Sequence, residues 1–80
     1  MKAKINVFLK PGILDPQGKT VLNAIEHLDY SGIQDVRIGK SIEIEFATGD
    51  KAKIKRDTEE ICQKLLANPV MENWRIEFEE

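Results

Sequence analysis

The 80-residue sequence has few of the residue types on which catalytic and nucleic-acid-binding sites depend. It contains one cysteine, one histidine and only 6% aromatic residues, and 14 acidic residues outnumber 12 basic ones. A single cysteine cannot form an internal disulfide, which is typical of a reducing compartment, so we expect a cytoplasmic protein. A net charge of −2 argues against a nucleic-acid-binding module, because such a module needs a basic face. No apolar run approaches the roughly 20 residues of a membrane span.

A recognisable catalytic constellation is also missing from the sequence. An active site needs a nucleophile beside a base, paired carboxylates in a cleft, or a cluster of metal ligands. His27 has no second histidine or cysteine at ligand spacing. Cys62 lies among apolar helix positions and is interpreted as a small core residue. We therefore predict that the chain has no catalytic residue of its own and binds neither a metal nor a cofactor.

Residues 9–18 are the stretch whose residue types most specifically determine the backbone conformation. Asp15 followed by Pro16 indicates a helix start, because the carboxylate accepts from free N–H groups and proline fits the first helical position. Gly18 would then lie in the first turn, where glycine costs about 1 kcal/mol relative to alanine. We explain this glycine by a neighbouring segment that packs against its backbone.

Hydrophobic periodicity predicts five elements in a single domain of residues 1–80. Strands alternate apolar and polar residues, whereas helices repeat apolar residues every three or four positions. The elements are a strand at 3–9, a helix at 16–28, a strand at 33–46, a helix at 51–67 and a strand at 74–78. We expect an α+β two-layer sandwich, related to ferredoxin-like folds, with both helices on one face of a small, mainly antiparallel sheet.

Two parts of this assignment carry alternatives. Residues 47–57 suit either a hairpin turned at Thr48-Gly49-Asp50 or the start of the second helix, capped by Thr48 or Asp50, and the helix is favoured. The extended segment 33–46 is long for a strand and contains Gly39, where a bulge or bend is expected. Because a strand that overhangs its sheet leaves edge groups unpaired, we hypothesise a homodimer joined through this strand.

Three motifs, in this order and spacing, resemble the PurS family, the small subunit of phosphoribosylformylglycinamidine synthase. They are Leu9-Lys10-Pro11-Gly12-Ile13-Leu14-Asp15-Pro16-Gln17-Gly18, Val36-Arg37-Ile38-Gly39-Lys40 and Cys62-Gln63-Lys64-Leu65-Leu66-Ala67-Asn68-Pro69-Val70-Met71-Glu72. The resemblance covers nearly the whole chain and firmly favours the helix over the hairpin, because Ile54 and Thr58 fall at apolar positions of the family's second helix. Thr58 is more polar than the family usually has there.

The resemblance implies a non-catalytic subunit of a three-protein enzyme in de novo purine biosynthesis. The PurQ partner would hydrolyse glutamine to ammonia. The PurL partner would use ATP and magnesium to convert formylglycinamide ribonucleotide to its amidine. A dimer or higher homo-oligomer of the PurS-like chain would bridge the two, and it would shelter ammonia in transit.

Eight motif residues are candidates for partner docking or for fixing the fold. They are Lys10, Asp15, Gln17, Gly18, Arg37, Gly39, Lys40 and Asn68. For Asp15, Gly39 and Asn68, a purely local role as cap, bend and stop competes evenly with docking. For Lys10, Gln17, Arg37 and Lys40, which fix no backbone geometry, contact with a partner is favoured.

Two other functions remain open on the sequence. One is a stand-alone ligand-binding regulatory domain, in which a small molecule would raise the melting temperature of the isolated chain by mass action. The other is a small enzyme that uses Arg37 or Lys40 on a phosphate, which would turn over substrate with no other protein present.

Overall fold

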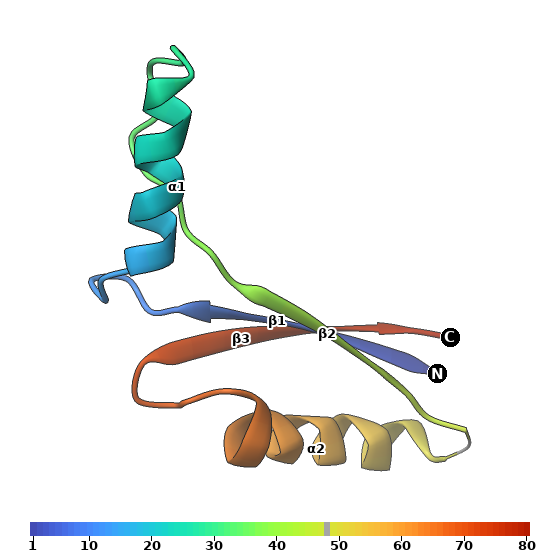
Figure 1. Cartoon of the computed structure of the whole chain (residues 1–80). Coiled ribbons are helices and arrows are strands. Elements are labelled where there is room, and N and C mark those ends of the chain that lie inside the picture. Colours follow the sequence, from blue (N-terminus) through green and yellow to red (C-terminus); the bar gives the residue numbers. More distant parts are fainter. Residues whose placement is uncertain (48) are drawn as a thin grey trace.

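The computed structural model describes residues 1–47 and 49–80 and confirms the predicted order of elements (Figure 1). The elements are β1 (Lys2–Leu9), α1 (Pro16–His27), β2 (Lys40–Glu45), α2 (Lys51–Ile61), the π-helical turn η1 (Cys62–Leu66) and β3 (Glu72–Glu79). The helix predicted at 51–67 is therefore confirmed over the hairpin. The capping role considered for Thr48 lies outside the described residues.

The three strands form one antiparallel sheet in the order β2-β1-β3, with β1 in the centre. Ile5 on β1 lies opposite Ile42 on β2 and Ile76 on β3. Because successive side chains of a strand point to opposite faces, this register places Ile5, Ile42 and Ile76 on the same face as the other buried apolar residues of the sheet. The α+β class predicted from the sequence is confirmed.

The core lies between this apolar face and α2 with η1, which run beneath the sheet (Figure 1). Ile5 and Val7 of β1 are buried there together with Cys62. Thr58 is also fully buried, and its Oγ1 donates to the Ile54 carbonyl at 2.7 Å. This bond satisfies the hydroxyl and explains why a polar residue is accepted at an apolar helix position.

The opposite face of the sheet carries a ladder of charges. Lys2 Nζ lies 3.6 Å from a Glu43 carboxylate oxygen, and Lys4 Nζ lies 3.1 Å from one of Glu79. The hydrogen bond and the charge of Glu79 raise the pKa of Lys4. Exposed ion pairs of this kind contribute only tenths of a kcal/mol each. This face is therefore polar and in contact with water, and its ion pairs add little to the stability of the fold.

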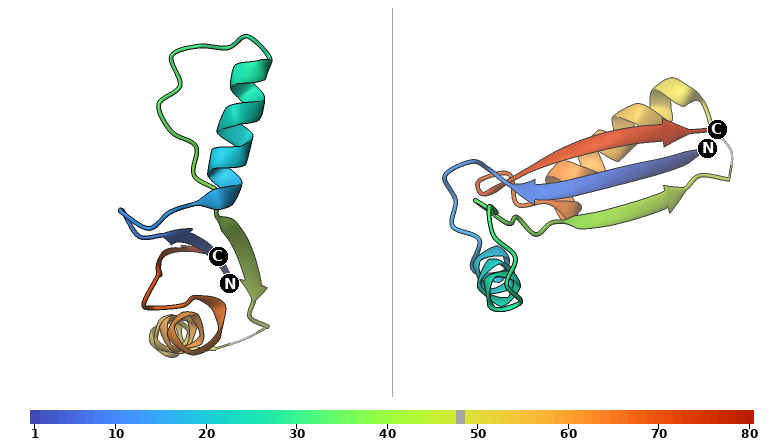
Figure 2. Two further views of the ribbon diagram at one scale, coloured as in Figure 1. Left: turned by 60° about the vertical axis from the view of Figure 1, so that its left-hand side comes forward. Right: turned by 90° about the horizontal axis from the view of Figure 1, so that it is seen from above.

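The predicted packing of both helices on one face of the sheet is wrong for α1. Helix α1 stands away from the sheet, with residues 30–39 returning beside it (Figure 2). We call residues 16–39 the arm. Only Gly18 is buried within α1, and Leu28 at its end is 68% exposed. The radius of gyration is 16.2 Å, against about 12 Å for a compact chain of this length.

The arm also accounts for the length of the second predicted strand. Residues 40–45 pair with β1 as β2, whereas residues 33–39 run along α1. Apolar spacing alone predicts which residues avoid water but not which chain segment covers them. Neither described helix is long and apolar enough to cross a membrane.

Candidate functional site

The arm joins the sheet at a junction organised by the Asp15 carboxylate. Its Oδ1 accepts from the Gly18 N–H at 2.9 Å, which caps α1 as predicted. Its Oδ2 accepts from the Ile38 N–H at 2.6 Å. These two bonds, that of Ile38 first, lower the pKa of the buried Asp15. One side chain therefore ties the start of α1 to the end of the return segment at the base of the arm.

Two glycines allow the backbones at this junction to touch. A Cβ on Gly18 would lie 2.0 Å from the carbonyl oxygen of Val36, and a Cβ on Gly39 would lie 2.6 Å from that of Val7. Both distances are far below van der Waals contact. The prediction that another segment packs against Gly18 is confirmed, and that segment is the return segment of the arm, residues 30–39. Close approach to β1 explains the glycine at 39.

Lys10 and Arg37 meet at the same junction. Arg37 Nη2 donates to the Lys10 carbonyl at 3.3 Å, and the Lys10 N–H donates to the Met71 carbonyl at 2.9 Å. The side chain of Arg37 is exposed and holds its neighbour through one long hydrogen bond. Because this bond contributes little to the fold, the guanidinium stays available to a partner.

Asn68 acts locally, before β3. Its Oδ1 accepts from the Val70 N–H at 3.0 Å, and its carbonyl accepts from the Glu72 N–H at 2.7 Å. The Glu72 side chain accepts in turn from the Asn68 N–H at 2.7 Å. This reciprocal set closes the turn between η1 and β3, which is the local role considered for this residue.

An open groove of about 320 Å³ runs along the junction. Its lining includes Val7 and Leu9 of β1 and the remaining candidates Gln17 and Lys40. Its lining residues are Val7, Leu9, Asp15, Pro16, Gln17, Ile38, Gly39, Lys40 and Glu72. Two motifs separated by about twenty residues in sequence are therefore brought together, whereas Asn68 lies apart from this groove.

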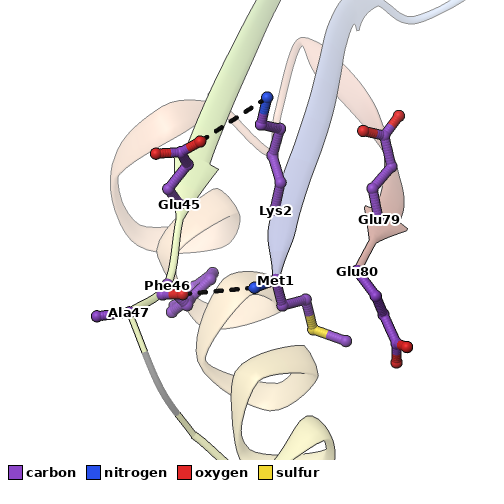
Figure 3. A pocket seen from close by; sticks show the side chains of 7 residues that line it. All are labelled: Met1, Lys2, Glu45, Phe46, Ala47, Glu79 and Glu80. Atoms are coloured by element: carbon purple, nitrogen blue, oxygen red, sulfur yellow. Dashed lines mark hydrogen bonds and ion pairs between the residues drawn. The ribbon is translucent and has the colours of Figure 1, made fainter.

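A second open groove, of about 530 Å³, lies at the other end of the sheet (Figure 3). It gathers Met1, Lys2, Glu45, Phe46, Ala47, Glu79 and Glu80. The N-terminal amine donates to the Phe46 carbonyl at 3.4 Å, and Lys2 lies 3.9 Å from Glu45. No sequence motif marks these residues, because only the sheet register brings them together at the end of β2.

The described residues include no group of three or more side chains placed to hold a metal ion. Both grooves are open, and some of their polar groups already bind within the chain, as Asp15 binds the Ile38 N–H and Lys2 pairs with Glu45. What the junction offers chemically is hydrogen-bonding and charged groups at the base of a projecting arm. This arrangement is suited to binding another protein.

We expect Cys62 to resist thiol reagents in the folded protein. The side chain is fully buried, and burial raises the pKa of its thiol, with the Glu59 charge adding to the effect. A raised pKa keeps the thiol protonated at pH 8, and the thiolate is the reactive form. Ellman's reagent should therefore label the native chain at pH 8 far more slowly than the chain in denaturant. Equal rates in the two states would contradict the buried assignment.

Comparison with known proteins identifies the family. The family described as PurS: Phosphoribosylformylglycinamidine (FGAM) synthase matches residues 2–80. Phosphoribosylformylglycinamidine synthase subunit PurS of Bacillus subtilis is 44% identical over 99% of this chain and 93% of that protein. The PurS subunit of Methanocaldococcus jannaschii is 37% identical over 98% and 94%.

Solved structures agree with this match. A Bacillus subtilis PurS structure superposes with a TM-score of 0.88, covering 99% of this chain and 98% of the other. A chain in the structure of PurLQS from Thermotoga maritima superposes with a TM-score of 0.84 at 29% identity, covering 95% and 93%. The resemblance seen in the three motifs is confirmed over the whole length, and this chain belongs to the PurS family.

Proposed function

We propose that this chain is a non-catalytic bridging subunit of phosphoribosylformylglycinamidine synthase in purine biosynthesis, joining the glutaminase PurQ to the synthetase PurL. The match to subunits of that enzyme over nearly the full length carries the proposal. A related chain is found in a structure of a PurLQS complex, which supports PurL and PurQ as the partners.

Membership of the PurS family implies how the chemistry is divided between the subunits. PurQ releases ammonia from glutamine, and PurL uses ATP and magnesium to activate the amide that ammonia attacks. This chain itself binds neither ATP nor magnesium. It acts in the cytoplasm. It contributes a shape of 50 × 26 × 15 Å with a projecting arm, which suits a homodimer that reaches two larger proteins.

Reconstitution tests the bridging role. PurL and PurQ are mixed with and without this chain, and amidine formation is measured with glutamine or with ammonium as the nitrogen source. Glutamine-dependent turnover should rise on addition of the chain, whereas ammonium-dependent turnover by PurL should change little. Full glutamine-dependent turnover in its absence would overturn the proposal. Turnover by the isolated chain would also overturn it.

Replacing Arg37 with alanine should weaken assembly without unfolding the chain. The side chain is exposed and makes one 3.3 Å bond to the Lys10 carbonyl, so we expect a stability change within about 0.5 kcal/mol. Co-elution with PurL and PurQ should fall in size-exclusion chromatography. Lys64→Ala, on an exposed part of η1, serves as the matched control. Unchanged co-elution of Arg37→Ala would remove this residue from the interface.

A further inference from the structure

The strand β3 leaves one edge of the sheet open. It is last in the order β2-β1-β3, and its residues Glu72–Glu79 include no proline, glycine or lysine that would interrupt or protect the edge. Natural sheets usually blunt or cover such an edge, because its unpaired N–H and C=O groups can pair with another chain. Figure 2 shows β3 along the outer margin of the sheet, on the side away from β2. The edge is therefore a candidate binding surface.

The register shows which backbone groups face this edge. The Lys10 N–H donates to the Met71 carbonyl at 2.9 Å, at a position that continues the register of β1 and β3. In an antiparallel ladder, bonded pairs alternate with pairs whose backbone groups point away from each other. The N–H and C=O groups of Trp74, Ile76 and Phe78 therefore point to the open edge, whereas those of the residues between them bond to β1.

The side chains of the same three residues form an apolar flank beneath the edge. Trp74, Ile76 and Phe78 are each only partly buried. Charged groups of α2 contact two of the rings. Glu59 Oε1 accepts from Trp74 Nε1 at 3.1 Å, and Lys55 Nζ lies 5.9 Å from the centre of the Phe78 ring. A strand added beside β3 would cover this flank with its own inward side chains, since neighbouring strands share their two faces.

The charges on the outer face specify the kind of strand that fits. Lys2 and Lys4 of the central strand lie between acidic rows on both neighbouring strands. The sign of charge therefore alternates across the sheet, and a strand beside β3 would continue this alternation with lysine or arginine. Opposite charges across a strand pair stabilise it. Glu77 is exposed and takes part in none of the ion pairs of the described residues, so it is the anchoring carboxylate.

We propose that an extended segment of a larger partner subunit adds to the sheet as a fourth strand beside β3, with basic side chains on the outer face and apolar side chains on the inner face. The proposal deepens the bridging function and rests on it, because it names the surface that holds one partner. Main-chain hydrogen bonds supply affinity in such strand addition, and alternate side chains supply specificity. A second copy is a poorer occupant, because its own β3 carries three carboxylates against one guanidinium.

Amide hydrogen exchange on the full chain distinguishes strand addition from other modes of docking. The chain is exchanged free and in complex with PurL and PurQ, and is then released and measured residue by residue by NMR. In the free chain, the N–H groups of Trp74, Ile76 and Phe78 should exchange about tenfold faster than those of Arg75 and Glu77, which bond to β1. In the complex this alternation should disappear, because all five N–H groups become bonded.

Alternation that persists in the complex would overturn the proposal, even where the chain still restores glutamine-dependent turnover. Protection of all five N–H groups in the isolated chain would show that a second copy occupies the edge, and would also overturn it. A failure of turnover to rise on reconstitution would instead contradict the bridging function itself.

Charge reversal at the edge gives an independent readout. Glu77→Lys should weaken binding to PurL and PurQ by about tenfold, and Glu77→Gln, which places no lysine opposite Lys4, should weaken it less. Glu60→Lys makes the same change of charge at an exposed position of α2 and serves as the matched control, with circular dichroism to check the fold of each variant. An equal loss of affinity in Glu60→Lys, or no loss in Glu77→Lys, would contradict binding at this edge.

Discussion

Gly18→Ala should destabilise the fold by about 1–3 kcal/mol, which is the usual cost of forcing an extra group into a packed site. Helix propensity alone predicts the opposite sign, because alanine is favoured over glycine by about 1 kcal/mol within a helix. The added Cβ would lie 2.0 Å from the Val36 carbonyl oxygen and 2.9 Å from its carbon. Both atoms belong to backbone, which cannot rotate away as a side-chain end can. The return segment must therefore move off α1.

Thermal unfolding followed by circular dichroism measures this effect, and amide hydrogen exchange reports whether the return segment has loosened. Lys19→Ala is the matched control, because it changes the next residue of the same helix at an exposed position and should alter stability by less than about 0.5 kcal/mol. A Gly18→Ala variant as stable as the parent would show that α1 and the return segment do not touch in solution.

Asp15→Asn should lower the melting temperature by roughly 5–10 °C, and Asp15→Ala should lower it further. The asparagine keeps an oxygen for the Gly18 N–H but places an amide N–H₂ toward the Ile38 N–H, where the carboxylate now accepts at 2.6 Å. Alanine removes both acceptors and leaves both donors without this partner. Asp29→Asn, at an exposed position just after α1, is the control and should change little.

The same carboxylate predicts an acid dependence of stability. Its pKa is lowered in the folded chain from an ordinary value of 3.8 by the N–H groups of Ile38 and Gly18. A lowered pKa means that the contribution is complete above the unfolded pKa and is lost as the pH falls through the folded value. Melting temperatures between pH 6 and pH 2 should therefore fall less steeply for Asp15→Asn than for the parent. Parallel curves would contradict this assignment.

Local patterns predicted most of the fold because they depend on neighbouring residues. The alternation of Ala3, Ile5 and Val7 fixes the buried face of β1, and Ile54 and Thr58, which the pattern places on one helix face, are buried in α2. The helix start at Asp15 and Gly18 is predictable for the same reason, because a cap and a first-turn glycine depend only on neighbouring residues in the sequence. The contact partner of Gly18, however, had to come from the three-dimensional structure.

Helix α1 shows where sequence patterns stop being sufficient. Its apolar stripe predicts a buried face, and the stripe was assigned to the sheet of the same copy. An apolar stripe can be buried equally well against a second copy of the chain. The sequence does not show whether the chain's own sheet or a second copy covers it. The junction groove was missed as a unit for a related reason. Its two halves, around Asp15 and around Gly39, are joined only by the path of the arm.

The central place of β1 has a consequence for how the protein is made. β1 begins at residue 2, yet one of its two neighbours, β3, ends at residue 79. The central strand of this sheet therefore stays half-paired on the ribosome until β3 has been synthesised. Such a distant pairing is slow, since a long loop must close before the contact forms. Nascent chains stalled or truncated before residue 72 should consequently expose the edge of β1 and aggregate.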